Sequence, residues 1–260
     1  MNKSFHETSI IDPSARIGND VVVGSYSIVE ADTEIGDGCR IDSHAIIASG
    51  ARLGRNCKVF NGAVVGTVPQ DLKFRDEKSE ILIGDETVIR EYCTLNRGTT
   101  DGGLVTRIGS GCLLMAYTHV AHDCSIGDRV ILANGVNMAG HVTIEDHVGM
   151  SALVLIHQFV RIGQHAYIGG GSRVSQDVPP YVLVNGEPVR YFGPNLVGLK
   201  RHGFKGEQIS AIKRAYQLIY RSGLNLTQAV DAIRSELDLT NEIINILGFM
   251  EKSQRGIAGR

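Results

Sequence analysis

The sequence predicts a mainly β protein in which short parallel strands wind into a β-helix, followed by an α-helical domain. Three observations predict this fold. An apolar residue recurs at every sixth position through most of the chain, Gly is abundant at 31 of 260 residues while Trp is absent, and a helical period replaces the six-residue period after residue 206. Frequent Gly suits the tight turns that short strands require.

The six-residue repeat has Ile, Leu, Val or Met at every step. It runs from Ile11 to Val65, resumes from Ile83 to Leu95, and resumes again at residues 108–174. Stacking such hexapeptide repeats buries one continuous core. The fourth residue after each apolar step is small or β-branched, and this place holds all five cysteines, which we therefore expect to be buried core residues rather than redox or metal-binding groups: Cys39, Cys57, Cys93, Cys112 and Cys124.

Two segments interrupt the repeat. Residues 66–82 keep its phase, whereas residues 96–107 shift the phase by one residue. Insertions in a solenoid usually form loops on one face, often the binding face.

The repeat ends near Pro179, and a helical pattern begins after Gly206. Residues 181–195 read as a connecting segment because Gly and Pro recur in them. Further helices are expected over about 227–237 and 241–252. The predicted domains are therefore 1–190, the β-helix with its two loops, and 191–260, the α-helical domain.

The composition argues against several classes of protein. The net charge is −2, so nothing in the total charge indicates binding to nucleic acid or to a membrane surface. No stretch approaches about 18 consecutive apolar residues, and residues 1–8 show no secretory signal. The odd number of cysteines without a C-x-x-C pair is typical of a reducing compartment. We expect a cytoplasmic protein with no membrane span.

Three hexads that start 18 residues apart each contain a histidine: VAHDCS at 120–125, MAGHVT at 138–143 and IHQFVR at 156–161. Hexapeptide-repeat proteins, which the chain resembles in its period, have left-handed coils of three hexads. Equivalent positions would then lie about 4.8 Å apart on one wall. Three histidines in register, with polar and Gly neighbours, favour a functional site made by His119, His122, Asp123, Gly140, His141, His157 and Gln158.

Two other interpretations of these histidines stay open. They could be exposed surface residues without a function. Alternatively, they could bind zinc, as histidines do in the hexapeptide-repeat carbonic anhydrases. The string HVAHDC is also suited to acid–base chemistry without a metal, since a neutral His removes protons near pH 7, and we expect no metal. His44, His147 and His165 fall outside the register, and we expect the last two to be stacked surface residues.

The chain closely resembles the UDP-N-acetylglucosamine O-acyltransferases, which catalyse the first step of lipid A biosynthesis. The resemblance covers nearly the whole chain. Its motifs are QDLKF at 70–74, NRGT at 96–99, HVAHDC at 119–124, AGHV at 139–142, IHQF at 156–159, QDVPPY at 176–181, GLKRHGF at 198–204 and YQLIYRSG at 216–223.

The resemblance implies a role for each matching residue. His122 would be the general base, Asp123 would support it, and the N–H of Gly140 would stabilise the oxyanion. Gly170 falls at the position of the acyl-length ruler, where Gly leaves room for a longer 3-hydroxyacyl chain. Residues implied to bind substrate are Asp71, Lys73, His119, His141, His157, Gln158, Asn195 and Arg201.

The resemblance also implies the partners. The acyl donor would be carried on the phosphopantetheine of acyl carrier protein, the acceptor would be UDP-N-acetylglucosamine, and no further cofactor is expected. The active sites would lie between subunits of a homotrimer. Seven basic residues and one acidic residue between Arg190 and Arg221 could attract an acidic carrier protein. Val197 and His202 depart from the pattern of the family in the region expected to bind the nucleotide.

Alternatives to this function stay open from the sequence. The acceptor could carry a 3-amino group in place of the hydroxyl, which would make the reaction an N-acylation. The related glucosamine N-acyltransferases are disfavoured by HVAHDC and by the tail. A zinc carbonic anhydrase or a scaffold without catalytic activity is a third possibility.

Overall fold

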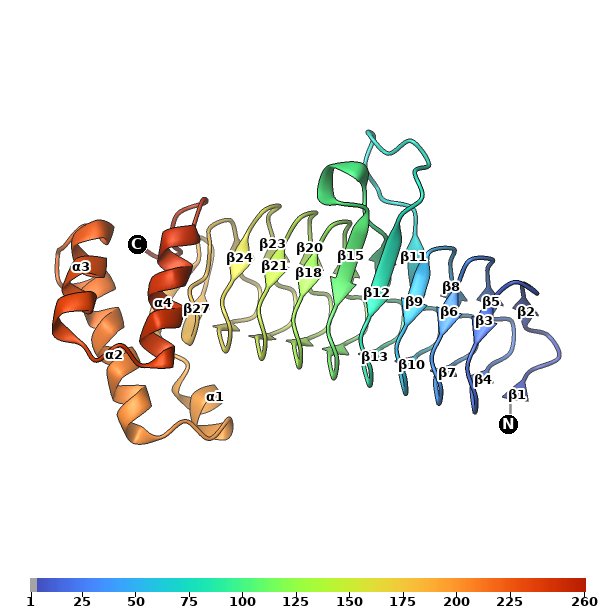
Figure 1. The fold of residues 1–260 in the computed structure, drawn as a ribbon, viewed down its shortest axis with the longest axis horizontal. Helices are drawn as coiled ribbons and strands as arrows, with labels where there is room; N and C mark the ends of the chain where they lie inside the picture. Colours follow the sequence, from blue (N-terminus) through green and yellow to red (C-terminus); the bar gives the residue numbers. More distant parts are fainter. Residues whose placement is uncertain (1–3) are drawn as a thin grey trace.

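The computed structural model describes residues 4–260, so the first three residues of the segment judged to lack a secretory signal lie outside the described residues. A long β-helix makes up most of the molecule, and four helices pack at its C-terminal end (Figure 1). The predicted mainly β fold, a left-handed parallel β-helix with a C-terminal α-helical part, is confirmed.

The β-helix has three walls, each a sheet of short strands. Sheet A contains β1 (Ser4–Phe5), β4 (Val22–Val23), β7 (Arg40–Ile41), β10 (Lys58–Val59), β13 (Val88–Ile89), β16 (Leu113–Leu114), β19 (Ile131–Leu132), β22 (Gly149–Met150), β25 (Tyr167–Ile168), β27 (Val182–Asn185) and β28 (Arg190–Pro194). Sheet B contains β2 (Ile10–Ile11), β5 (Ile28–Val29), β8 (Ile46–Ile47), β11 (Val64–Thr67), β14 (Thr94–Asn96), β17 (His119–Val120), β20 (Asn137–Met138), β23 (Leu155–Ile156) and β26 (Arg173–Val174). Sheet C contains β3 (Arg16–Ile17), β6 (Glu34–Ile35), β9 (Ala51–Leu53), β12 (Glu80–Ile83), β15 (Val105–Ile108), β18 (Ser125–Ile126), β21 (Thr143–Ile144) and β24 (Arg161–Ile162).

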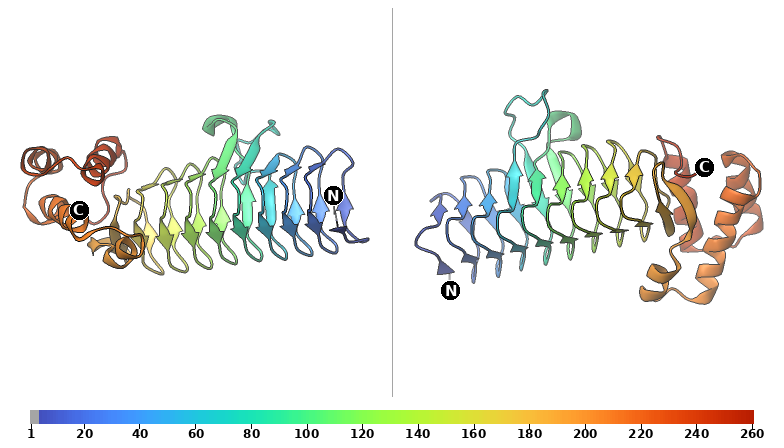
Figure 2. Two further views of the ribbon diagram at one scale, coloured as in Figure 1. Left: turned by 60° about the horizontal axis from the view of Figure 1, so that its bottom comes forward. Right: turned by 180° about the vertical axis from the view of Figure 1, so that it is seen from behind.

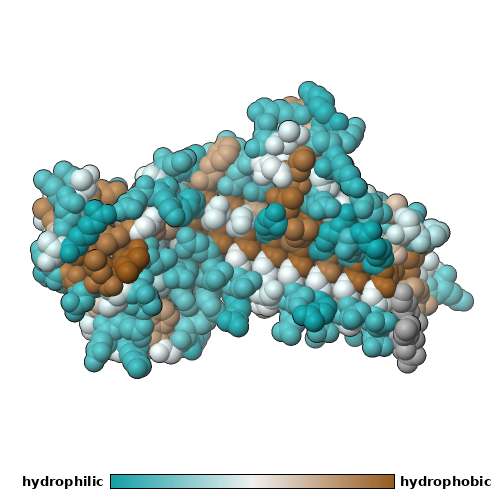
Figure 3. Space-filling view, viewed as in Figure 1, coloured by the Kyte–Doolittle hydropathy of each residue, from teal (hydrophilic) through white to brown (hydrophobic). Residues whose placement is uncertain are grey.

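The strand register confirms the coil of 18 residues on the wall that carries the histidines. Val120 pairs with Met138, and Met138 pairs with Ile156. The apolar residue of each hexad points inward, and hydrophobic residues form a continuous band along the β-helix (Figure 3).

The five cysteines are buried and unpaired within this core, as expected. Burial raises the pKa of the Cys124 thiol to about 12 and that of Cys93 to about 11. Alkylation requires an accessible thiolate. We therefore expect a thiol reagent to modify none of the five cysteines in the native protein and all of them after denaturation, as counted by mass spectrometry. Rapid modification of the native protein would contradict the buried core position.

Both interruptions of the repeat form loops that project from one edge of the β-helix (Figures 1 and 2). The first lies between β11 and β12, and the second lies between β14 and β15 and contains the short 3-10 helix Thr100–Gly102. The two loops contact each other, because the backbone N–H of Thr100 donates to Glu77 at 3.1 Å.

The helical part contains α1 (Leu196–Arg201), α2 (Gly206–Arg221), α3 (Leu226–Glu236) and α4 (Asn241–Lys252). Helices α3 and α4 match the predicted ranges to within one residue at each end, and α2 begins where the helical pattern was expected. None of the helices in residues 4–260 is long and apolar enough to cross a membrane.

The expectation of a simple connecting segment at residues 181–195 was wrong. The segment contains β27 and β28, which pair as antiparallel neighbours at the end of sheet A. Gly186 and Pro188 therefore mark the turn of a hairpin. Helix α1 was missed because its six residues are too few to show a helical period.

A buried carboxylate joins the end of the β-helix to the C-terminal segment. Asp177 is fully buried and accepts hydrogen bonds from the backbone N–H of Arg161 at 2.8 Å and from the hydroxyl of Ser253 at 2.7 Å. The hydroxyl of Tyr216 in α2 donates to the carbonyl of Pro180 at 2.5 Å. The helical part is thus attached by specific polar contacts as well as by apolar packing, and the boundary at residue 190 stays a prediction.

Candidate active site

A cavity of about 760 Å³ opens beside the two inserted loops, at the corner between sheets B and C. The first loop contributes one side of it, and the turns after β17, β20 and β23 contribute the other. The structure brings together here seven residues that the sequence assigned to the site: Asp71, Lys73, His119, His122, Gly140, His141 and Gln158.

A histidine and a carboxylate form a close pair at the floor of this cavity. His122 Nδ1 lies 2.7 Å from Asp123 Oδ2, and the Asp123 side chain is 1 % exposed. An ionised carboxylate only accepts hydrogen bonds, so Nδ1 carries the hydrogen and Nε2 keeps its lone pair. This tautomer leaves Nε2 able to take a proton from a substrate in the cavity.

The second inserted loop fixes Asp123. Its Oδ1 accepts a hydrogen bond from the backbone N–H of Thr99 at 2.7 Å, and its Oδ2 accepts one from the Thr99 hydroxyl at 2.6 Å. The backbone N–H of Asp123 donates to the hydroxyl of Thr106 at 2.8 Å. The sequence analysis missed both threonines. The NRGT motif and the one-residue phase shift at 96–107 show that this segment departs from the repeat, and they could have pointed to a functional contact there.

Gly140 lies against the His122 ring. A Cβ atom built on Gly140 would come within 2.6 Å of His122 Cε1, so a larger residue would displace the imidazole. The next residue, His141, stacks on Phe159 with ring centroids 4.6 Å apart and meets the His122 ring edge-on at 5.3 Å. Close packing of the rings therefore restricts the orientation of His122.

His119 is the first residue of β17 in sheet B, three residues before His122. Its Nδ1 lies 2.7 Å from the hydroxyl of Thr94. Burial lowers the pKa of His119, the hydrogen bond with Thr94 opposes this in part, and the nearby His122 adds a smaller lowering. His119 is thus suited to be a neutral hydrogen-bonding group at the wall of the cavity.

Of the two residues from the first inserted loop, Lys73 is exposed at the rim, whereas Asp71 is half-buried and accepts a hydrogen bond from the backbone N–H of Lys73 at 2.9 Å. Lys73 is 80 % exposed and pairs loosely with Asp101 at 3.7 Å. Asp101 also lines the cavity and was missed by the sequence analysis. Such an exposed ion pair contributes little to stability, so the side chains of Lys73 and Asp101 are both available to a ligand.

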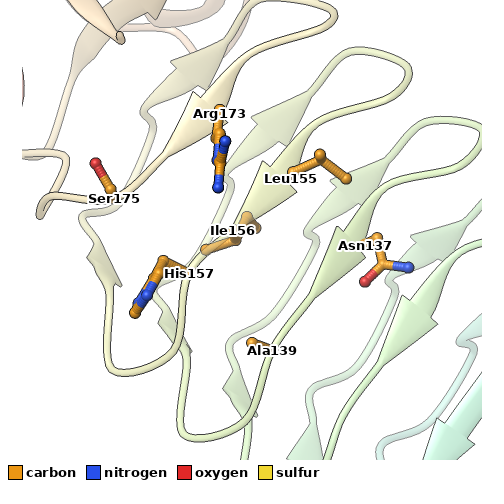
Figure 4. A pocket seen from close by; sticks show the side chains of 7 residues that line it. All are labelled: Asn137, Ala139, Leu155, Ile156, His157, Arg173 and Ser175. Carbon is orange, nitrogen blue, oxygen red and sulfur yellow. The ribbon is translucent and has the colours of Figure 1, made fainter. Parts of the chain in front are cut away.

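A mostly apolar groove of about 510 Å³ continues from the cavity along sheet B (Figure 4). Asn137, Leu155 and Arg173 lie on successive strands along it, and His157 lies at its edge (Figure 4). His157 therefore lines this neighbouring groove rather than the His122 cavity. Gly170 lines neither space, and a Cβ atom there would lie 3.2 Å from the carbonyl oxygen of Ala152.

Asn195 and Arg201 lie apart from the His122 cavity. They line a separate hollow of about 480 Å³ at α1, together with Val197, Tyr167 and Leu183. The structure of one chain therefore does not bring the two halves of the predicted substrate site together.

The expectation that His165 lies on the surface was wrong. It is only 9 % exposed, because His202 and Phe204, in the segment after α1, cover its ring. Its predicted stacking on His147 is confirmed, with ring centroids 4.6 Å apart. Burial, followed by the neighbouring His147 and His202, lowers the pKa of His165 to about 4.

Comparison with known proteins decides the family. The bacterial transferase hexapeptide model matches residues 32–67 and 106–140, and the model described as UDP-N-acetylglucosamine O-acyltransferase, domain 2, matches residues 177–258. A curated acyl-[acyl-carrier-protein]–UDP-N-acetylglucosamine O-acyltransferase from Anaeromyxobacter dehalogenans is 50 % identical over 254 residues, which cover 98 % of this chain and 99 % of that protein. The chain belongs to the UDP-N-acetylglucosamine O-acyltransferase family.

Other members of the family are also similar to this chain over nearly its whole length. The protein of the same name from Stenotrophomonas maltophilia is 47 % identical over 252 residues, which cover 96 % of each chain. The crystal structure of the UDP-N-acetylglucosamine acyltransferase from Bacteroides fragilis superposes with a TM-score of 0.95 at 42 % identity, covering 97 % of this chain and 98 % of that chain. The similarity thus extends over the β-helix, both inserted loops and the helical part.

Proposed function

We propose that the chain transfers a 3-hydroxyacyl group from acyl carrier protein to the 3-position of UDP-N-acetylglucosamine, the first step of lipid A biosynthesis. The names of its relatives support this donor and acceptor. The observation that carries the proposal is the His122–Asp123 pair at the floor of an open cavity.

In the proposed reaction, Nε2 of His122 removes the proton of the sugar 3-hydroxyl as its oxygen attacks the thioester carbonyl. Asp123 keeps His122 in the required tautomer and stabilises the imidazolium that forms. The backbone N–H of Gly140 donates to the carbonyl oxygen as it becomes negative. Collapse of this intermediate breaks the carbon–sulfur bond, and the proton passes from His122 to the leaving thiol.

Binding of the nucleotide is proposed to require a second subunit. Asn195 and Arg201 line a hollow separate from the His122 cavity in one chain, whereas one sugar nucleotide would have to contact both places. A homotrimer with active sites between subunits would meet this requirement. The guanidinium of Arg201 would then bind the diphosphate, while His119, His141, Gln158, Asp71 and Lys73 would surround the sugar and the reacting carbonyl.

The acyl chain is proposed to lie in the apolar groove of sheet B, beside His157. Burial of methylene groups there would contribute about 0.8 kcal/mol each. Gly170 does not line this groove in one chain, so its proposed part in setting the acyl length would depend on a neighbouring subunit. The basic residues between Arg190 and Arg221 would attract the acidic carrier protein, and the reaction would take place in the cytoplasm.

An assay with mixed acyl carrier proteins tests the proposal. The purified chain should convert UDP-N-acetylglucosamine to a 3-O-acyl product that mass spectrometry identifies, with one acyl length preferred. The matching 3-amino sugar nucleotide should be assayed in parallel, because a His base could also serve an amine. Product from the amino sugar alone would replace O-acylation by N-acylation, and no product from either would contradict the proposed activity.

A further inference from the structure

Three histidines gather away from the candidate active site, where α1 meets the corner between sheets C and A. His147 and His165 occupy equivalent turns of successive coils and stack at an interplanar angle of 6°. His202 follows α1 directly and meets both rings edge-on, with centroids 4.8 and 4.9 Å away. One potential ligand atom from each of the three lies within 4.8 Å of the others.

Two nitrogens in this cluster lack the partners that buried polar atoms normally have. Nδ1 of His147 and Nδ1 of His165 are both buried, and neither forms a hydrogen bond with any part of residues 4–260. His165 as a whole is only 9 % exposed. Unpaired buried polar atoms are rare in folded proteins, and where they occur they can mark the place of a bound ion.

We propose that His147, His165 and His202 form a binding site for a divalent transition-metal ion of the zinc class. Imidazole suits zinc, copper and nickel, whereas calcium and magnesium prefer oxygen ligands. The site would clamp α1 onto the end of the β-helix. It does not depend on the proposed acyl transfer.

Binding requires the rings to move closer together and to turn out of their present stack. Tetrahedral zinc with nitrogen ligands at about 2.0–2.1 Å places those nitrogens about 3.4 Å apart, so atoms within 4.8 Å of one another must close by at most about 1.4 Å. His202 is exposed and His147 is half-buried, so both rings have room to turn toward the fixed His165.

The surroundings of the cluster carry charges of both signs. Burial, His202 and Arg129 lower the pKa of His147, while Asp146 and Asp128 oppose this in part. The segment is already anchored on its other side, since the Asn195 side chain donates to the carbonyl of His165 at 3.0 Å. A metal ion would add a second point of attachment after the last turn of α1.

Zinc binding by the full chain tests the proposal. After removal of bound metal with a chelator, the protein should bind one Zn²⁺ per chain in competition with a chromophoric chelator. H147F keeps a ring to stack on His165 but removes a ligand, and should weaken binding at least tenfold. H44F is the matched control, because His44 also stacks on an aromatic ring, that of Tyr26 at 5.2 Å, and lies far from the cluster.

A second variant separates this site from the other histidine cluster. His122, Asp123 and His141 also place potential ligand atoms within 4.8 Å of one another. H141A should bind zinc as the unmodified protein does. Loss of binding in H141A with binding retained in H147F would overturn the proposal, as would the absence of zinc binding to the unmodified protein at 100 μM metal, about a hundredfold above a micromolar Kd. Circular dichroism establishes that each variant is folded.

Discussion

Replacing His122 with Ala should lower the rate of acyl transfer by about 10²–10⁴-fold, the usual contribution of a positioned general base. The substitution removes the only ring in the cavity whose Nδ1 is bonded to a buried carboxylate, among the residues that the structure describes. Steady-state kinetics should show the loss in kcat, because the base acts in the transition state more than in substrate binding.

The fold should tolerate this substitution. His122 lies at a turn outside the continuous core, and its side chain is 14 % exposed. Thermal unfolding of H122A should therefore stay close to that of the unmodified protein. H44A serves as a control for losing an exposed histidine from a turn, and should keep full activity. An H122A protein that is folded and retains most of its activity would contradict the role of His122 as base.

Replacing Gly102 with Ala should reduce kcat by about 10²-fold, although Gly102 touches no part of the proposed substrate. A Cβ atom at this position would lie 1.9 Å from Cγ of Asp123, so the carboxylate or the loop must move. Either movement would weaken the hydrogen bond that orients His122, and a displacement of about 1 Å can cost this much activity.

The neighbouring Gly103 provides a matched control for this prediction. Its φ of +85° is unfavourable for Ala, yet a Cβ atom there would meet nothing within 4 Å. G103A should therefore show a small loss of stability, about 1 kcal/mol, and little loss of kcat. Equal effects of G102A and G103A on kcat would indicate that general disturbance of the loop, rather than contact with Asp123, lowers the activity.

The β-helix could be predicted in detail from the sequence because each strand and turn is determined by the six residues of its own repeat. Each hexad repeats the same requirements, an inward apolar residue and a small residue at the turn, so the register follows from counting. The five cysteines illustrate this, since their position in the hexad was sufficient to place them in the core. The hairpin of β27 and β28 was missed because its strands lack the six-residue period. The Gly and Pro residues of its turn are also the residues expected in a linker.

The candidate site was predictable only where it follows the repeat. The 18-residue interval placed His122 and His141 on adjacent coils, and the structure confirms their contact. Thr99 reaches Asp123 from an inserted loop whose path no period describes. His165 was misplaced for a similar reason, because its cover comes from a segment more than 35 residues later in the chain.

The antiparallel pairing of β28 with β27 has a consequence for the association of these molecules. A β-helix built only of parallel coils could accept further coils end to end, and its open strand edges would favour fibre growth. At the C-terminal end, β28 runs in the opposite direction to every other strand of sheet A, and the helices cover it. Sheet A therefore offers no free parallel edge to another coil at this end, and the chain itself hinders end-to-end polymerisation on that side.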